Sequence, residues 1–208
     1  MQLCCNYQLI ELLEKRENEC IYFDSHSNCS VNRLQEISAS LAASYSEYGI
    51  TEKDILKNIT VAYPNDLLAL LANIISLERS TKSIKLIIID SIPTFHKKTD
   101  YDTATKLQAL LTLIQHLSYL SQTKECAIVV VNHLTTKEID INYTQINYQL
   151  KKEFPFSFTK SLGVSFSSFI KLTLYLFQST DAPQIIVHSA FSLDNPIVNF
   201  SISQNGFE

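Results

Sequence analysis

The chain has 208 residues, of which 46% are hydrophobic and 18% charged, and it carries a formal net charge of −4. This composition is typical of one globular domain that is long enough to bury a core without disulfide bonds. It argues against a protein that grips nucleic acid unaided, because such proteins usually carry a surplus of Lys and Arg. Any DNA contact is therefore expected to come from a local patch or to be shared with a partner.

The five cysteines are odd in number and include no C-x-x-C pair. They favour a reducing compartment over a disulfide framework or a zinc site. Residues 1–5 lack the basic start of a secretory signal, and charged residues at 11–17 interrupt the apolar run too early. No stretch approaches the roughly 18 uninterrupted apolar residues of a membrane span. We therefore expect neither a leader peptide nor a membrane segment.

The first two thirds of the chain alternate between helical and strand patterns. Residues 103–121 place leucines and isoleucines on one helical stripe, whereas 85–90 and 126–131 are continuous apolar runs. Such alternation predicts a mainly parallel sheet with helices on both faces, an α/β fold. In chain order the patterns predict a helix over 2–17, a strand over 20–24, a helix over 31–48, a strand over 59–63, a helix over 65–79, a strand over 85–90, a helix over 103–121 and a strand over 126–131.

The character of the chain changes after residue 134. Residues 134–160 are polar, with interleaved Tyr, Phe and Lys and no period, which predicts a mobile loop. Strands are expected over 170–177, 184–189 and 196–203, with turns at Pro183 and at Asp194-Asn195-Pro196, and these short runs favour antiparallel pairing. The expected organisation is a single domain over 1–208, with an α/β core at 1–133, a loop at 134–160 and a β-rich tail at 161–208.

The strand ending in Leu86–Asp90, followed by Ser91, has the Walker B pattern of nucleotide-binding α/β proteins. A buried parallel strand delivers an aspartate to the carboxyl edge of the sheet, where ligands bind and where a carboxylate can hold magnesium. The pattern alone is weak, because many buried strands end in an aspartate without binding anything.

The phosphate-binding loop that should accompany Walker B does not occur in this sequence. There is no G-x-x-x-x-G-K-[ST], and the three glycines, Gly49, Gly163 and Gly206, are far apart. Without that loop there is no cradle of backbone N–H groups and no lysine for the phosphates. Independent ATP hydrolysis is therefore not expected.

The order of these segments resembles the ATPase core of the RecA/RadA-type recombinases and their paralogues. Residues 1–4 are similar to the start of the helix directly after that family's phosphate loop, and Leu86–Ser91 matches its Walker B strand. Further matching segments are Ile21–Ser25 and Asn32–Leu34 (the next strand and helix), Val130–His133 (the strand end that senses the nucleotide), Ser161–Phe166 (a Leu-Gly motif), and Ile185–Ser189 with Phe200–Glu208 (the closing strands). The resemblance implies a RecA-like P-loop NTPase core that lacks the phosphate-loop strand and has an antiparallel β-rich C-terminal part.

Two departures from the family pattern imply a non-catalytic subunit. His26 stands where active members carry the glutamate that orients water, and His133 stands where they carry a sensing glutamine. His133 can equally be an ordinary strand-end histidine. The resemblance then leaves Asp90, Ser91, Asn132 and His133 as a degenerate nucleotide and magnesium edge. We expect no cofactor bound independently, with ATP and magnesium held, if at all, at a subunit interface.

The family binds single-stranded DNA on two loops, which here correspond to residues 95–101 and 134–160. Lysines beside aromatic side chains suit single strands without sequence preference. The alternative is a surface loop whose aromatic residues cover a partner or the tail sheet. The DNA-binding candidates are Lys97, Lys98, Tyr143, Tyr148, Lys151, Lys152 and Lys160.

A sheet of this family without its phosphate-loop strand has a structural problem, because that strand is central. Its loss leaves edges unpaired beside the strand at 126–131 and beside the tail. A partner or neighbouring segment can fill the gap, the flanking strands can pair directly, or the chain is a shortened product. The sequence leaves all three open.

The resemblance implies a nuclear recombinase paralogue acting in homologous recombination and DNA repair. Its partners would be other RecA-like paralogues, the recombinase itself and single-stranded DNA. An alternative is a subunit of a composite DNA-dependent ATPase whose partner supplies the phosphate loop. A third reading, a small-molecule α/β enzyme using Cys126 or His133, finds no supporting triad order or metal-ligand spacing.

Overall fold

The structure is a computed structural model that describes residues 1–27, 31–136, 158–160, 170, 172–178, 183–189, 197–199, 202–203 and 206–207. The chain divides into two compact units. The first comprises Met1–Asn132 with Gln204–Gly206, and the second comprises His133–Ser203 with Phe207–Glu208. This division falls beside the expected end of the α/β core at residue 133, and the single domain over 1–208 stays a prediction.

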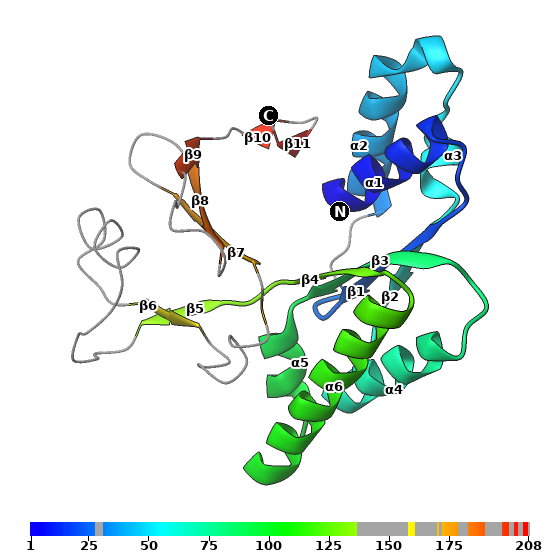
Figure 1. Cartoon of the computed structure of the whole chain (residues 1–208). Coiled ribbons are helices and arrows are strands. Elements are labelled where there is room, and N and C mark those ends of the chain that lie inside the picture. The colour runs from blue at the N-terminus through cyan, green and yellow to red at the C-terminus, as the bar shows by residue number, and fades with distance from the viewer. Residues whose placement is uncertain are drawn as a thin grey trace. The chain divides into compact units, whose positions relative to one another are not determined.

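The first unit is built on a four-stranded parallel sheet in the order β2-β1-β3-β4 (Figure 1). The expected parallel α/β core is therefore confirmed. Its elements are α1 (Gln2–Leu13), β1 (Glu19–Asp24), α2 (Val31–Ser44), the 3-10 helix η1 (Ser46–Tyr48), α3 (Glu52–Leu56), β2 (Ile59–Ala62), α4 (Leu67–Glu78), β3 (Ile84–Asp90), α5 (Ile92–Lys98), α6 (Thr103–Thr123) and β4 (Ala127–Val130).

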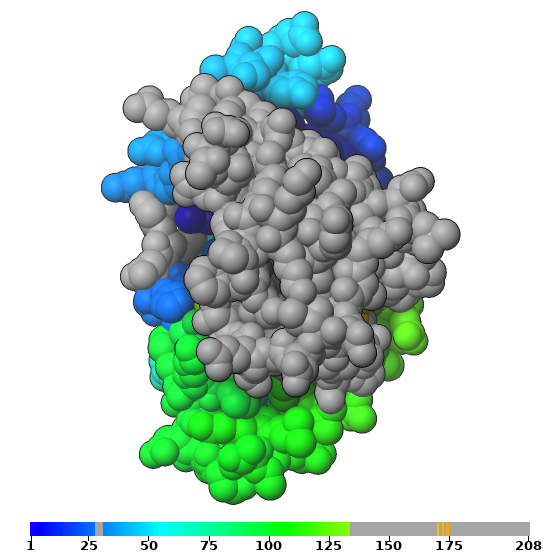
Figure 2. Space-filling view, turned by 90° about the vertical axis from the view of Figure 1, so that its left-hand side faces the viewer, coloured from blue at the N-terminus to red at the C-terminus, as the bar shows by residue number. Residues whose placement is uncertain are grey.

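Helices cover both faces of this sheet. Figure 1 shows α1, α2 and α3 on one face and α4, α5 and α6 on the other. In the perpendicular view of Figure 2, the green helices α5 and α6 lie at one end of the first unit and the cyan residues near position 50 at the other. The two layers bury β1 and β3 on both sides, which explains their continuous apolar sequences.

Alternate residues of the two central strands enter different cores. Tyr22 of β1 and Ile88 of β3 pack with Cys4 of α1 in one buried cluster. The next residues along each strand, Phe23 and Ile89, point to the opposite face by the strand's period of two and are also buried.

Side-chain caps define where several helices begin. Asp66 accepts a hydrogen bond from the Ala69 N–H at 2.8 Å at the start of α4. Asp102 does the same for Thr105 at 3.0 Å at the start of α6. Such caps satisfy N–H groups that have no partner within the helix. The short α3, which the periodicity did not predict, begins with a reciprocal capping box formed by Thr51 and Asp54.

Helix α5 overlaps the segment 95–101 where the first DNA-binding loop was expected, so the loop prediction is wrong for residues 95–98. Pro93 lies in the first turn, where a proline suits a helix, and Ile92 and Phe95 are fully buried. Residues 99–102 alone connect α5 to α6.

The second unit contains short antiparallel strands. Strands β5 (Leu134–Thr136) and β6 (Phe158–Lys160) form a pair, and β7 (Leu172–Gln178), β8 (Pro183–Ser189) and β9 (Ile197–Asn199) form a three-stranded sheet. Two further strands, β10 (Ile202–Ser203) and β11 (Gly206–Phe207), pair with each other. The segment expected as one strand over 196–203 is therefore divided between β9 and β10.

None of the helices in the described ranges combines the length and apolar character needed to cross a membrane. Cys4, Cys5, Cys20 and Cys126 are buried and take part in no disulfide bond among the described residues, and Cys29 lies outside those residues.

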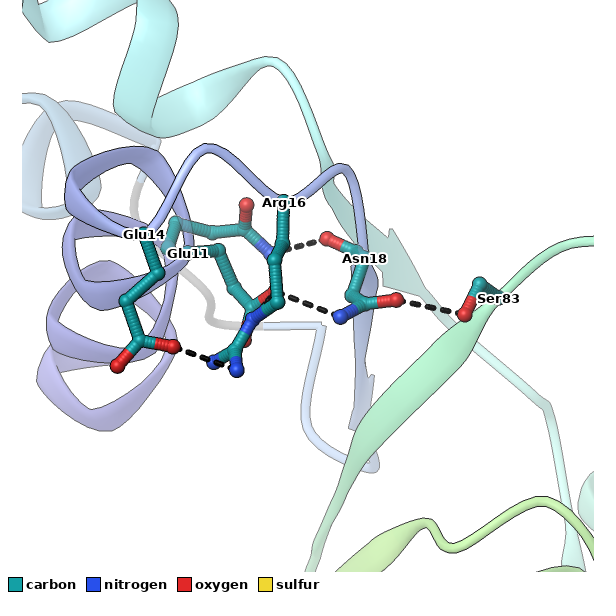
Figure 3. Close-up of polar contacts among 6 residues, drawn as sticks. Glu11, Glu14, Arg16, Asn18 and Ser83 are labelled. Carbon is teal, nitrogen blue, oxygen red and sulfur yellow. Dashed lines mark hydrogen bonds and ion pairs between the residues drawn. The ribbon is translucent and has the colours of Figure 1, made fainter.

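A buried polar network fixes α1 to the amino-terminal edge of the sheet (Figure 3). Glu11 is 2% exposed and accepts hydrogen bonds from the guanidinium of Arg16 at 2.8 and 3.1 Å and from Asn18 Nδ2 at 2.6 Å. Asn18 precedes β1, and its Oδ1 accepts a 2.6 Å hydrogen bond from Ser83, which precedes β3. The amide of Gln8 adds a 3.0 Å bond to the Asn18 carbonyl. The end of α1 and the starts of two strands are thereby held together.

Glu11 is stabilised in its charged form. Burial raises the pKa of this carboxyl, but hydrogen bonds from Arg16 and Asn18, together with the positive charge of Arg16, outweigh burial and hold the pKa below its ordinary value. A carboxyl with a depressed pKa stabilises the fold above its unfolded-state pKa of about 4.3, and this stabilisation is lost as the pH falls through the folded-state pKa.

Substitution Glu11→Gln is therefore expected to lower the free energy of unfolding at pH 7 by roughly 1–3 kcal/mol, the range for a lost charged hydrogen bond. Urea unfolding at pH 7 and at pH 3 measures the difference between wild type and variant, which should shrink at the lower pH. Glu36→Gln is the control, because its 2.9 Å pair with Arg33 is exposed. Equal effects of the two substitutions would contradict this account.

Candidate functional site

The carboxyl ends of β1 and β3 are joined by backbone and side-chain hydrogen bonds. Asp24 and Asp90 occupy equivalent register positions on the two neighbouring strands. The Ser25 N–H donates to the Asp90 carbonyl at 2.7 Å, and the Ser91 N–H donates to Ser25 Oγ at 2.9 Å. Ser25 and Ser91 are fully buried, so these bonds set the direction of the chain as it leaves each strand.

Asp90 presents its carboxylate at this edge. Its side chain accepts a 2.6 Å hydrogen bond from the Tyr22 hydroxyl at Oδ2. Tyr22 is 7% exposed, whereas Asp90 itself is half-buried. The aspartate is therefore held from the protein side and remains accessible from solvent.

Helix α5 packs polar side chains against the same edge. Ser91 and Thr94 hydroxyls lie 2.9 Å apart, and Thr94 Oγ1 lies 3.1 Å from His26 Nε2. One turn later, Lys98 Nζ donates to the Ser25 carbonyl. The backbone N–H of His26 in turn donates to Asp24 at 2.8 Å. The edge is thus a continuous hydrogen-bonded network that includes the start and the end of α5.

The four residues predicted for the nucleotide edge lie at and just beyond the ends of β3 and β4. Asp90 and Ser91 are the last residue of β3 and the residue after it. Val131 N–H donates to the Ile89 carbonyl at 2.9 Å, which continues the β3–β4 ladder by one residue, and Asn132 follows it in the chain. His133 is exposed and begins the second unit. The function of all four residues stays a prediction.

The residues predicted to bind DNA lie in different parts of the chain. Lys97 and Lys98 are both exposed on the last turn of α5, and Lys98 also donates a hydrogen bond to the Ser25 carbonyl. Lys160 is the last residue of β6. Tyr143, Tyr148, Lys151 and Lys152 lie outside the described residues.

Sequence reasoning missed Tyr22, Ser25 and Thr94 as members of this edge. One signal for Tyr22 was available, because side chains two apart on a strand share a face and Asp24 had already marked the strand's end. The hydrogen bond to Asp90, by contrast, depends on the β1–β3 register, which the sequence alone does not specify.

Cys126 does not have the properties of a catalytic nucleophile. It is 2% exposed, and burial raises the pKa of its thiol to about 11, only partly countered by Lys85 and Lys124. Nucleophilic cysteines need a lowered pKa and access to substrate. The small-molecule enzyme using this thiol therefore receives no support.

The donor chemistry at the edge suits a hard cation. The carboxylate of Asp90 offers oxygen, and Oδ1 accepts no hydrogen bond within the part of the chain that the structure describes. Oxygen ligands with water completing the shell are the usual environment of Mg²⁺. In the described ranges, no three His, Cys, Asp or Glu side chains gather closely enough to hold a metal by themselves. Any magnesium here would need phosphate or water ligands in addition to Asp90.

Comparison with known proteins identifies the family of this chain. The family model described as Rad51 matches residues 1–156, which include the whole parallel sheet and the Asp90 edge. The chain belongs to the Rad51 family. The RecA-like resemblance expected from the sequence is thereby confirmed.

Three relatives show where in the Rad51 family the similarity lies. The chain is 30% identical over 149 residues to DNA repair protein RAD57 of Saccharomyces cerevisiae, a match covering 67% of this chain and 31% of that protein. It is 26% identical over 136 residues to DNA repair protein RAD51 homolog 3 of Dictyostelium discoideum, covering 58% and 35%. It is 28% identical over 123 residues to DNA repair and recombination protein RadB of Methanosphaera stadtmanae, covering 58% and 49%. The matches therefore span at most about half the length of these relatives.

Ser25→Ala should destabilise the first unit, because the buried Ser91 N–H loses its acceptor. An unsatisfied buried donor costs about 1–3 kcal/mol, which urea unfolding detects. Ser44→Ala is the matched control, since the Ser44 hydroxyl bonds the Ser40 carbonyl on an exposed helix surface. If both variants unfold at the same urea concentration as wild type, the joined edge does not contribute to stability.

Proposed function

We propose that this Rad51-family chain is an accessory subunit in homologous recombination and DNA repair, which pairs with other RecA-like subunits and supports recombinase assembly on single-stranded DNA. The observation that carries the proposal is the combination of the Asp90 edge with a parallel sheet that ends in an apolar strand, β4. The relatives named for DNA repair and recombination support the process, and the nucleus is the corresponding location in a eukaryote.

Strand β4 has the sequence of a central strand but the position of an edge. Within the described ranges it pairs with β3 alone. Cys126–Val131 contains no charge and no proline, the usual features that protect an exposed edge. Because Val131 N–H points to β3, the alternating ladder directs the N–H groups of Ile128 and Val130 away from β3. A strand from a RecA-like subunit fits this edge.

A composite ATPase is the second candidate, and the accessible Asp90 carboxylate favours it. Magnesium, when bound, would neutralise phosphate charge. In that arrangement Asp90 holds or orients the ion, while the neighbouring subunit supplies the phosphate loop. His26, bonded to Thr94, occupies the place of the water-orienting glutamate and does not supply a fixed carboxylate base.

Single-stranded DNA is proposed to contact Lys97 rather than Lys98. Both lysines are exposed on the last turn of α5, but the ammonium of Lys98 also donates a hydrogen bond to the Ser25 carbonyl. Tyr101, four residues further along the chain between α5 and α6, is 53% exposed and is the proposed aromatic partner. A lysine beside a stacking aromatic suits a single strand.

Affinity purification of the tagged chain from cells, followed by mass spectrometry, tests the proposed pairing. A RecA-like protein should be recovered in stoichiometric amounts. Recovery of the folded chain without one would overturn the proposal.

Val130→Pro should weaken that pairing by roughly 5- to 100-fold, because it removes one outward N–H and leaves a partner carbonyl unsatisfied at about 1–3 kcal/mol. Val130→Ala, which retains the N–H, is the matched control. Quantitative pull-down titration measures both variants. Retention of full affinity by the proline variant would exclude β4 as the paired edge.

Lys97→Gln should weaken binding of the partnered chain to labelled oligo(dT) and reduce the salt dependence by about one ionic contact. Lys57→Gln removes an equally exposed charge at the end of α3 and should have no effect. Fluorescence anisotropy at several salt concentrations distinguishes the two. The same salt slope for wild type and Lys97→Gln would remove Lys97 from the DNA contact.

A further inference from the structure

We infer that Tyr22 is the positioning residue for Asp90: its buried hydroxyl holds one carboxylate oxygen and leaves the other to bind a divalent cation. This inference rests on the proposed role of Asp90 as a magnesium-holding group. It assigns a function to a residue on a different strand, outside the Walker B segment.

The geometry places Tyr22 and Asp90 on one face of the sheet. Asp24 pairs in register with Asp90, and Tyr22 pairs with Ile88, so the tyrosine lies one strand across and two residues back from the aspartate. Side chains at these four positions share a face by the strand period. The phenol spans this diagonal and reaches Asp90 Oδ2 at 2.6 Å.

The surroundings of Tyr22 make its ring a rigid support. It is 7% exposed and belongs to the buried cluster that contains Cys4, Cys20 and Ile88. A hydroxyl on a ring held by core packing is fixed relative to the sheet, so the carboxylate that accepts its hydrogen bond is also restricted. Asp90 is half-buried, and without this hydrogen bond its side chain would populate several rotamers.

The hydrogen bond also determines which oxygen is available. Tyr22 occupies Oδ2, while Oδ1 accepts no hydrogen bond from the residues that the structure describes. A carboxylate held in this way favours binding of the cation through one oxygen. Partners that orient a ligand from behind typically change metal affinity by about 10- to 100-fold when removed.

Paramagnetic broadening by Mn²⁺ tests the inference on the full chain without a nucleotide or partner. The δ1 methyl groups of Ile89 and Ile92 flank Asp90 and serve as reporters in a chain labelled at isoleucine. Ile84, at the other end of β3, is the internal reference, since six residues of strand separate it from Asp90 by about 20 Å. Broadening at millimolar Mn²⁺ detects a weak site.

In wild type, Ile89 and Ile92 should broaden at Mn²⁺ concentrations that leave Ile84 sharp. Asp90→Asn should abolish the broadening, and Tyr22→Phe should require about 10-fold more Mn²⁺ for the same effect. In the Asp90→Asn background, Tyr22→Phe should have no further effect. Tyr119→Phe removes an exposed hydroxyl from α6 and should behave as wild type.

The variant Ile88→Val controls for a loss of core stability that is unrelated to the positioning of Asp90. This variant removes a methyl group from the same buried cluster but leaves the Tyr22 hydroxyl, and its Mn²⁺ response should match wild type. Unchanged or tighter Mn²⁺ binding in Tyr22→Phe, while Asp90→Asn abolishes it, overturns the positioning role alone. Two outcomes overturn both this inference and the magnesium role of Asp90: broadening of Ile89 and Ile92 that persists in Asp90→Asn, and no broadening in wild type. Neither outcome affects the proposed pairing with RecA-like subunits.

Discussion

The parallel pairing of β1 with β3 is the constraint on which the candidate site depends. It aligns Asp24 with Asp90, allows the Ser25 N–H to reach the Asp90 carbonyl, and brings the Tyr22 hydroxyl to the carboxylate. A shift of one residue in this register would turn Tyr22 to the opposite face and separate it from Asp90. The same pairing is held at the opposite edge, where Glu11, Asn18 and Ser83 join α1 to the starts of both strands. The polar edge and the polar network thus lie at opposite ends of one ladder.

Much of the first unit could be predicted because its sequence patterns are long and continuous. Strand β3 and helix α6 have the clearest runs, and both lie within two residues of the predicted ends. The ends that differ have local causes: α1 stops at Leu13, after which Lys15 adopts a left-handed conformation and the Arg16 N–H returns to the Glu11 carbonyl. Helix α5 was not predicted, because Pro93 suits the first turn of a helix as well as a loop, and because Phe95 was assigned to a loop although it is buried in the core.

The candidate site was only partly predictable. Asp90 and Ser91 stand out because a polar pair follows an apolar strand. The contribution of Tyr22 requires knowledge of which strand lies beside β3, and Lys98 requires knowledge that α5 folds back over the end of β1. Lysines near an aromatic residue suggested DNA binding for Lys97 and Lys98 alike, whereas the internal bond of Lys98 separates the two.

Membership of the Rad51 family, and a strand β4 that pairs with β3 alone among the described residues, motivate the proposal of a subunit that functions with others. A carboxylate at the edge of a RecA-like sheet does not bind ATP without groups that hold the phosphates. This sequence contains no phosphate-binding loop motif. In the proposed composite site, a neighbouring subunit would supply the groups that hold the phosphates. Under the same proposal, neighbouring subunits would contribute to binding of the DNA phosphate backbone, which an acidic chain is not expected to grip alone.

The most direct measurement is an equilibrium titration with fluorescent ATP and Mg²⁺, performed on the isolated chain and on its complex with a RecA-like subunit. The account predicts no saturable binding by the isolated chain, and binding by the complex that weakens when Asp90 is replaced by asparagine on this chain only. Tight, magnesium-dependent binding by the isolated chain, or a complex whose affinity is unaffected by Asp90→Asn, would contradict it.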